Sequence, residues 1–285
     1  MPLLYYWQPD NYRRDLDYGV GFHLSQGSKR LHEVDIGDSV WAFTRMRGGG
    51  YALAAQLVIK AKTLNPPGYR YGKYRVWGDL ERSRYFHIDA QTDVESTLRK
   101  ASGRTSAKMF AQAFQGHAAV VHIDLASHQA LSELGADLPH EPRARILPEE
   151  KLEAELLFGN EATVRRFIDA EDSGLADDRR AYLYSEAPSR NRRLVRELYD
   201  LYDNRCQLCE WDPLDLYSRP LCEAHHLVWL SRGGEDDLSN MVLICPNHHR
   251  AIHRCDAPFD FLDLSFRFSE SLRESLQLNR HLVGC

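Results

Sequence analysis

The first half of the chain contains short apolar runs with the residue types of β-strands. Residues 39–44 and 51–59 are rich in Val, aromatic and small apolar residues. Arg47 followed by three glycines separates them, which predicts a β-hairpin. Residues 118–123 predict a later buried strand, and residues 105–114 predict a helix. Strands are therefore expected to dominate the N-terminal structure.

The second half of the chain changes to a helical period. Leu194, Leu198 and Leu201 recur on one face of a helix predicted over residues 189–202. Apolar residues later return with an approximate period of two, which predicts a strand or hairpin at the end of this region. These later positions are Phe259, Phe261, Leu264, Phe266 and Phe268.

The chain is longer than one typical domain. Its 285 residues compare with roughly 100 to 200 for an average domain, so two domains are expected. We predict an α+β protein with an N-terminal domain over residues 1–146 and a second domain over residues 189–285. An acidic, helical connector is expected between them, over residues 147–188, with its helix around residues 151–158.

Acidic residues are concentrated in the predicted connector. Residues 149–180 contain ten acidic and five basic side chains, which accounts for the whole formal net charge of −5. Residues 190–196 instead carry four arginines and no acid, and residues 69–85 interleave Arg and Lys with aromatic residues. Because the distribution of charge marks a nucleic-acid-binding surface better than its sum does, a DNA partner is compatible with this composition.

The sequence predicts neither a membrane span nor an export signal. Apolar runs stay well short of the roughly 18 residues that cross a bilayer, and residues 1–15 lack the parts of a secretory signal. We therefore expect a cytoplasmic protein with no membrane partner. All six cysteines lie at or after Cys206. In a reducing compartment such clustering indicates metal binding rather than disulfides.

Two close pairs of ligand residues predict a structural zinc site. Cys206 and Cys209 form one pair, Cys245 and His248 form the other, and 35 residues separate the pairs. Structural Zn²⁺ prefers four tetrahedral Cys and His ligands, and two such pairs can fold back onto one ion. A redox function of the first pair is the alternative, but the strand and helix context of a thioredoxin-like motif is missing.

Five of the thirteen histidines fall at ligand-like spacings in this region. His249 and His253 are four residues apart, so on a helix they share a face and can bind one ion. His248 lies about 100° around the same helix and can serve the zinc. His225 and His226 are adjacent, and adjacent strand residues face opposite sides. Both reach one site only where the strand bends or ends.

The order of these residues resembles the HNH endonuclease family. The resemblance runs through the His-His pair, Gly233 and Gly234, Asn240, the Cys-x-x-His pair and the following His-x-x-x-His. It implies a ββα-metal fold in which His226 is the general base and Asn240 holds the loop that carries it. Trp229 stands where many relatives have proline, which leaves the local turn open. The ligands implied for the catalytic metal are His225, His249 and His253.

The chemistry that this resemblance implies is metal-assisted hydrolysis of a phosphodiester. A Mg²⁺ or Mn²⁺ ion would neutralise charge on the phosphate, and a histidine with an ordinary pKa near ~6.5 can take a proton from water. Cys222 and Cys255 are interpreted as buried thiols, although Cys255 is an alternative metal ligand. Double-stranded DNA is the expected partner. Arginines that could hold its backbone, each also explicable as solvated surface, are Arg190, Arg193, Arg232 and Arg250.

Segments of the N-terminal domain resemble EVE-type domains of the PUA-like superfamily. The resemblance rests on residues 4–7, 21–31, 35–43 and 51–59, and it implies a small β-barrel that accepts a modified base. A flipped base needs stacking surfaces and polar groups at its edge. The alternative is that such aromatic residues fill the barrel core. The base-reading residues expected on this basis are Trp7, His23, Ser25, Trp41, Tyr71 and Trp77.

These features together predict a modification-dependent DNA restriction endonuclease. HNH modules cut with little sequence preference, so the N-terminal domain is expected to select the target. The alternatives are a non-catalytic, zinc-dependent DNA-binding protein and an HNH nuclease that acts as a toxin or on RNA. One HNH site cuts one strand, so double-strand cleavage would imply a homodimer or two binding events.

Overall fold

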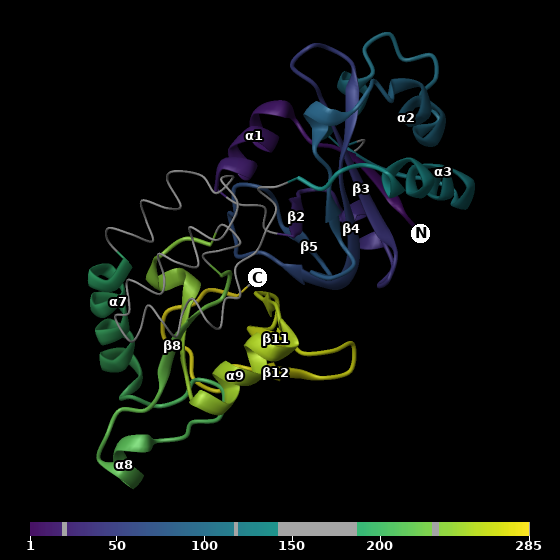
Figure 1. The fold of residues 1–285 in the computed structure, drawn as a ribbon. Helices are drawn as coiled ribbons and strands as arrows, with labels where there is room; N and C mark the ends of the chain where they lie inside the picture. Colours follow the sequence, from purple (N-terminus) through teal and green to yellow (C-terminus); the bar gives the residue numbers. More distant parts are fainter. Residues whose placement is uncertain (19–21, 117–118, 142–186, 230–233, 285) are drawn as a thin grey trace. The chain divides into compact units, whose positions relative to one another are not determined.

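The structure is a computed structural model in which the chain forms two compact units, each described by itself below (Figure 1). Of the described residues, the N-terminal unit comprises 1–16, 22–62, 68–116 and 119–141, and the C-terminal unit comprises 17–18, 63–67, 187–229 and 234–284. Each unit mixes helices and strands, which confirms the α+β class. The residues that the structure describes are 1–18, 22–116, 119–141, 187–229 and 234–284. The helix predicted at 151–158 lies outside them.

A seven-stranded sheet forms the centre of the N-terminal unit (Figure 1). Its order is β2-β5-β4-β3-β1-β7, with β6 paired to β4, and it curls into a half-barrel. β1 pairs with β3 in parallel, whereas the β3–β4 and β2–β5 pairs are antiparallel. The strands are β1 (Leu3–Tyr6), β2 (His23–Gln26), β3 (Ser39–Arg45), β4 (Tyr51–Leu64), β5 (Tyr74–Gly78), β6 (Arg84–Tyr85) and β7 (Val120–His122).

The predicted hairpin is confirmed as β3 and β4. Arg45 lies opposite Tyr51, and the connecting glycines take left-handed conformations, with φ of 90° at Gly49 and 72° at Gly50. Glycine adopts this conformation without steric cost, which explains the run of glycines at the turn. The strand predicted at 118–123 is also found, although β7 is shorter and Ala118 lies outside the described residues.

The helix predicted over residues 105–114 is wrong. The α-helix lies earlier, and it ends where Gly103 adopts a left-handed conformation with φ of 68°. The Arg99 guanidinium then donates to the carbonyl oxygens of Arg104 and Ala107, which holds the following segment in turns. Apolar residues of that segment, such as Phe110, fill the core without a helical backbone. The helices of this unit are α1 (Pro9–Tyr18), α2 (Glu95–Ser102) and α3 (Leu125–Ala136), with 3₁₀ turns at Lys29–Glu33, Ile88–Ala90 and Ala111–Ala113.

Aromatic side chains fill the core of the N-terminal unit. Phe43 contacts Phe110 with stacked rings 5.3 Å apart and Phe114 edge-on at 4.9 Å. Trp41 is fully buried, and its indole N–H donates to His128 Nδ1 at 3.0 Å, on α3. Because α2 and α3 lie side by side over this cluster, one face of the sheet is closed by helices (Figure 1).

The C-terminal unit is built on a two-stranded hairpin followed by a helix. β8 and β9 are antiparallel, with His226 opposite Met241, and α9 follows β9 directly. The predicted helix over 189–202 is confirmed as α7, which buries Leu198 and Tyr202 in the core. The elements are α7 (Ala187–Tyr202), α8 (Pro213–Tyr217), β8 (Glu223–His226), a 3₁₀ turn (Leu238–Asn240), β9 (Met241–Ile244) and α9 (Pro246–Cys255).

A small sheet ends the C-terminal unit. The period-two pattern is confirmed as the β10–β11 hairpin, and a third strand, β12, extends it beyond the predicted element. Its bounds are β10 (Phe259–Asp260), β11 (Ser265–Arg267) and β12 (Arg273–Ser275). Within the described residues of both units, no helix combines the length and the apolar character that crossing a membrane requires.

Candidate metal centres

Four sulfur and nitrogen ligands gather beside the start of α9. The ligand atoms of Cys206, Cys209, Cys245 and His248 all lie within 4.8 Å of one another. Cys245 caps α9, and Pro246 at the first helical position fixes the turn that brings His248 back toward it. The chain bends at the other pair too, where Glu210 N donates to Cys206 O and Glu210 has a φ of 58°. This Cys₃His set has the ligand number and type of a structural zinc site.

Hydrogen bonds within this set distribute its protons unevenly. The hydrogen bond with Cys245 and burial raise the pKa of the Cys206 thiol, while the same bond lowers the pKa of Cys245 to about 3. The bond to the Cys245 sulfur also raises the pKa of His248. The other ring nitrogen of His248 lies 3.3 Å from the carboxylate of Glu274 on β12. Such an outer carboxylate fixes the orientation of a ligating imidazole.

The remaining cysteines in this unit lie outside both ligand groups of the described residues. Cys222 is buried, and Cys255 is exposed. Cys222 therefore fits the predicted buried thiol, whereas Cys255, at the end of α9, is neither buried nor placed among the ligands.

Three histidines form a second group. His225 on β8 and His249 and His253 on α9 each offer a nitrogen within 4.8 Å of the others. The Nε2 atoms of His249 and His253 are 3.0 Å apart, and the His225 ring lies 5.2 Å and 4.9 Å from their ring centroids. The one-turn spacing on α9 and the antiparallel β8–β9 pair produce this convergence. An imidazole set suits transition metals better than Mg²⁺, which prefers oxygen ligands.

Glu223 and Trp229 contact this histidine group and orient its rings. Neither contact was predicted from the sequence. The Glu223 carboxylate lies 2.6 Å from His249 Nδ1, so Nε2 of that ring is turned toward His253. Trp229 stacks on His253, with ring centroids 4.9 Å apart and an interplanar angle of 30°. Glu223 is two residues before His225 on the same strand, and that alternation of strand faces was the signal that could have identified it.

His226 lies beside this group on the strand but is held by different contacts. Its Nε2 atom is 2.9 Å from the Asp236 carboxylate, and both side chains are buried, at 7% and 4% exposure. β8 ends at His226, which meets the condition for adjacent histidines to serve one region. Asp236 lies ten residues after His226, between β8 and β9, so their contact depends on how the chain folds back between the two strands.

Asn240 closes that loop. Its side-chain oxygen accepts from Val228 N, and its amide donates to Val228 O and to Glu235 O. Gly234 is packed so closely that a Cβ atom there would lie 1.9 Å from Val228 O. These hydrogen bonds join Val228, just after β8, to the segment that precedes β9.

The predicted phosphate-binding arginines are only partly described. Arg193 on α7 and Arg250 on α9 are exposed. Arg190 belongs to α7, but its side chain lies outside the described parts of the structure, and Arg232 lies outside the described residues altogether.

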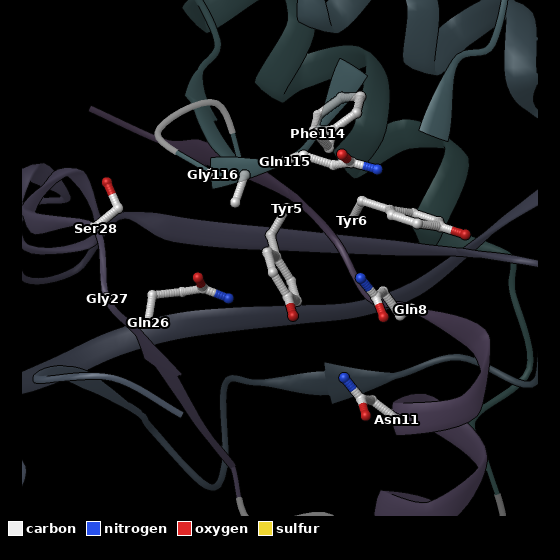
Figure 2. A pocket seen from close by; sticks show the side chains of 11 residues that line it. Tyr5, Tyr6, Gln8, Asn11, Gln26, Gly27, Ser28, Phe114, Gln115 and Gly116 are labelled. Carbon is white, nitrogen blue, oxygen red and sulfur yellow. The ribbon is translucent and has the colours of Figure 1, made fainter. Parts of the chain in front are cut away.

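The predicted base-reading residues lie in different parts of the N-terminal unit, with His23 opposite Trp77 on the β2–β5 pair. Trp41 and Trp77 are 0% and 2% exposed, so both fill the interior, as the alternative interpretation held. Arg75, itself buried, lies over the Trp77 ring, and Ser25 accepts a hydrogen bond from that guanidinium. A cavity of about 480 Å³ does open in the N-terminal unit (Figure 2), but none of Trp7, His23, Ser25, Trp41, Tyr71 and Trp77 lines it.

Comparison with known proteins identifies the region that holds the ligands. Residues 206–254 match the HNH endonuclease family. A segment of 34 residues is 50% identical to the type IV methyl-directed restriction enzyme EcoKMcrA of Escherichia coli strain K12, and it spans 12% of each chain. Another relative, anaredoxin of a Nostoc species, is 27% identical over 73 residues, which is 26% of this chain and 88% of that protein.

A solved structure is also similar in part. The type IV phosphorothioation-dependent restriction endonuclease ScoMcrA matches 80% of this chain and 46% of its own, with 15% sequence identity and a TM-score of 0.21. The class of the domain is therefore taken from the sequence matches and not from this structural similarity. This chain carries a metal-dependent endonuclease domain of the HNH class at residues 206–254. Its relatives include McrA-like restriction enzymes.

Proposed function

We propose that this protein is a modification-dependent DNA restriction endonuclease. The observation that carries the proposal is the convergence of His225, His249 and His253 beside a Cys₃His zinc-type set, inside the HNH domain. One relative, EcoKMcrA, is a methyl-directed restriction enzyme, which supports the same function. We assign recognition of a modified base in double-stranded DNA to the N-terminal unit.

The residues around His226 fit a general base. Because the Asp236 carboxylate accepts at Nε2, that nitrogen carries the proton and Nδ1 is the basic atom of the neutral ring. Water deprotonated there would attack the phosphorus, and Asp236 would stabilise the imidazolium that forms. Asn240 keeps the loop that carries Asp236 closed onto the end of β8.

The three-histidine group would hold the catalytic ion. A bound divalent ion supplies Lewis-acid stabilisation of the phosphate and of the leaving oxygen. Of the two ions proposed, Mn²⁺ fits three imidazole nitrogens better than Mg²⁺ does. Glu223 would keep His249 in the ligating orientation, and the Cys₃His set would hold Zn²⁺ as a structural element.

Backbone contacts to DNA are proposed for the basic residues near α7 and α9. Exposed Arg193 and Arg250 are available for phosphate contacts, and the same function is proposed for Arg190 and Arg232. Double-strand cleavage by single-strand cutters would then require two protomers, so a homodimer on DNA belongs to the proposal.

The test compares nicking of modified and unmodified plasmid in Mn²⁺ or Mg²⁺ by the wild-type chain and by His249→Ala. Loss of a ligand or base is expected to lower the cleavage rate by about 10²- to 10⁴-fold, with His226→Ala as the second variant. His140→Ala, an exposed histidine of the N-terminal unit, is the matched control and should cut normally.

The outcomes separate the alternatives. Salt-sensitive binding without any metal-dependent strand break by the wild type would indicate a non-catalytic DNA-binding protein. Preferential cutting of RNA when RNA and DNA compete would indicate an HNH nuclease that acts on RNA. Equal cutting of modified and unmodified DNA would contradict the proposed recognition of modified bases but not the proposed nuclease activity.

A further inference from the structure

The cavity of the N-terminal unit is assembled from several parts of the fold, including residues 114–116 and Ala119. Tyr5 comes from β1, Gln26 from the end of β2, and Gln8 from the segment between β1 and α1. Figure 2 shows the Tyr5 ring between the amides of Gln8 and Gln26. Its volume of about 480 Å³ falls within the range of roughly 300 to 1,000 Å³ that is usual for small-molecule sites.

The lining of this cavity carries no formal charge. Among its lining residues in the described chain, none is Asp, Glu, Lys, Arg or His. Phosphate binding normally relies on Arg, Lys or a series of backbone N–H groups. An uncharged cavity with amides and aromatic rings is therefore better matched to a neutral, planar ring than to the DNA backbone.

Three of the side-chain amides that line the cavity are available to a ligand. Within the described residues, the side-chain amides of Gln8, Gln26 and Gln115 make none of the hydrogen bonds that hold the fold. An amide presents one acceptor and two donors. This pairing matches the adjacent donor and acceptor groups on a base edge, as in the bidentate contact of Gln or Asn with adenine.

We propose that this cavity accepts a single uncharged nucleobase extruded from duplex DNA. Gln8 and Gln26 bond its edge, and the Tyr5 ring supports its face. This inference rests on the proposed function, which makes DNA the ligand, and it assigns base reading to residues other than those expected from sequence. Lys29 is exposed and follows the lining residue Ser28, so it can meet a phosphate outside the cavity.

The test measures binding of fluorescent duplexes to the full chain without added Mg²⁺ or Mn²⁺. The duplexes carry 5-methylcytosine, 5-hydroxymethylcytosine, N6-methyladenine, a phosphorothioate linkage or no modification. Each modified base is opposed by its complement or by a mismatched base. Mispairing lowers the cost of extrusion, so the preferred base should bind on the order of tenfold more tightly when mispaired.

Two kinds of variant address the cavity itself. The double variant Gln8→Leu with Gln26→Leu removes the amides at nearly constant volume. Gly27→Leu instead adds a side chain to the lining, where a Cβ atom meets nothing within 4 Å. Each should lower the preference for the modified base at least about tenfold, toward the affinity for unmodified DNA. Gln129→Leu, an exposed amide on α3 outside the cavity, should keep it.

Two results would overturn the inference. One is a preference that survives both the double Gln variant and Gly27→Leu, each shown to be folded by circular dichroism. The other is a panel in which no modified base is preferred or mispairing has no effect, including a preference for the phosphorothioate alone. Metal-dependent nicking by the same protein preparation reports separately on the nuclease, so either result leaves the proposed cleavage activity standing.

Discussion

The two units concentrate their candidate chemistry in opposite ways. In the C-terminal unit, thiols and imidazoles between Cys206 and His253 form two ligand groups held by carboxylates. In the N-terminal unit, the cavity draws neutral residues from positions as distant as Tyr5 and Ala119. Metal ligation needs rare residue types in fixed numbers, whereas a base-sized cavity can be lined by common amides and rings. The difference teaches where sequence motifs are informative and where only folding reveals a site.

Loss of zinc should produce the largest difference between the units. In Cys245→Ser, or after removal of zinc by a chelator, the C-terminal unit is expected to lose its structure, because structural zinc contributes about 10 to 16 kcal/mol of apparent folding free energy in small zinc domains. The N-terminal unit has its own aromatic core and should stay folded. Hydrogen exchange followed by mass spectrometry would show rapid exchange in β8–β9 and protection in β3–β4.

The matched control for zinc loss is Cys255→Ser. Its thiol is exposed and lies outside both ligand groups of the described residues, so zinc content and exchange should not change. Simultaneous loss of protection in both units of Cys245→Ser would show that the two units do not fold independently.

Weakening the orientation of the base should have an intermediate effect. Asp236→Asn keeps the shape of the side chain but removes the charge that stabilises a protonated His226. The cleavage rate should fall by about 10- to 100-fold, with little change in KM and a shifted pH–rate profile. Asp200→Asn, which changes an exposed carboxylate on α7 away from this loop, is the control and should leave the rate and the profile unchanged. An unaltered pH profile in Asp236→Asn would exclude a function for Asp236 in positioning the base.

Acid should weaken the C-terminal unit slightly through His281. Burial lowers the pKa of His281 below its ordinary value of 6.5, and its ring contacts Tyr202 Oη and Met241 O. The unfolded chain therefore binds the proton more readily, so this contribution to stability is present above the unfolded pKa and declines as pH falls through it. The Tm of this unit should fall by a few degrees, roughly, between pH 7 and 5.5.

The comparison variant for acid is His281→Asn. This substitution should reduce the change in Tm of the C-terminal unit with pH and leave the Tm of the N-terminal unit unchanged. A pH dependence that is unchanged in the variant would show that other groups cause it.

Patterns local to one element predicted much of the fold. The hairpin of β3 and β4 and the helix α7 follow from residue type and period, because burial of one face or run fixes them. The helix predicted over residues 105–114 was wrong because Arg99 and Gly103 hold that segment in turns. Apolar residues at a helical spacing can also reach the core from a segment that forms turns, so the spacing alone does not distinguish the two structures.

The same distinction applies to the sites. The spacing of the cysteines and histidines determined from sequence alone which residues can share an ion, because i, i+4 and two-residue spacings are local geometry. Only the tertiary structure joined Asp236 to His226, stacked Trp229 on His253, placed Trp41 in the core and opened the cavity beside Tyr5. These contacts depend on how loops close and elements pack over long sequence separations, which no local period encodes.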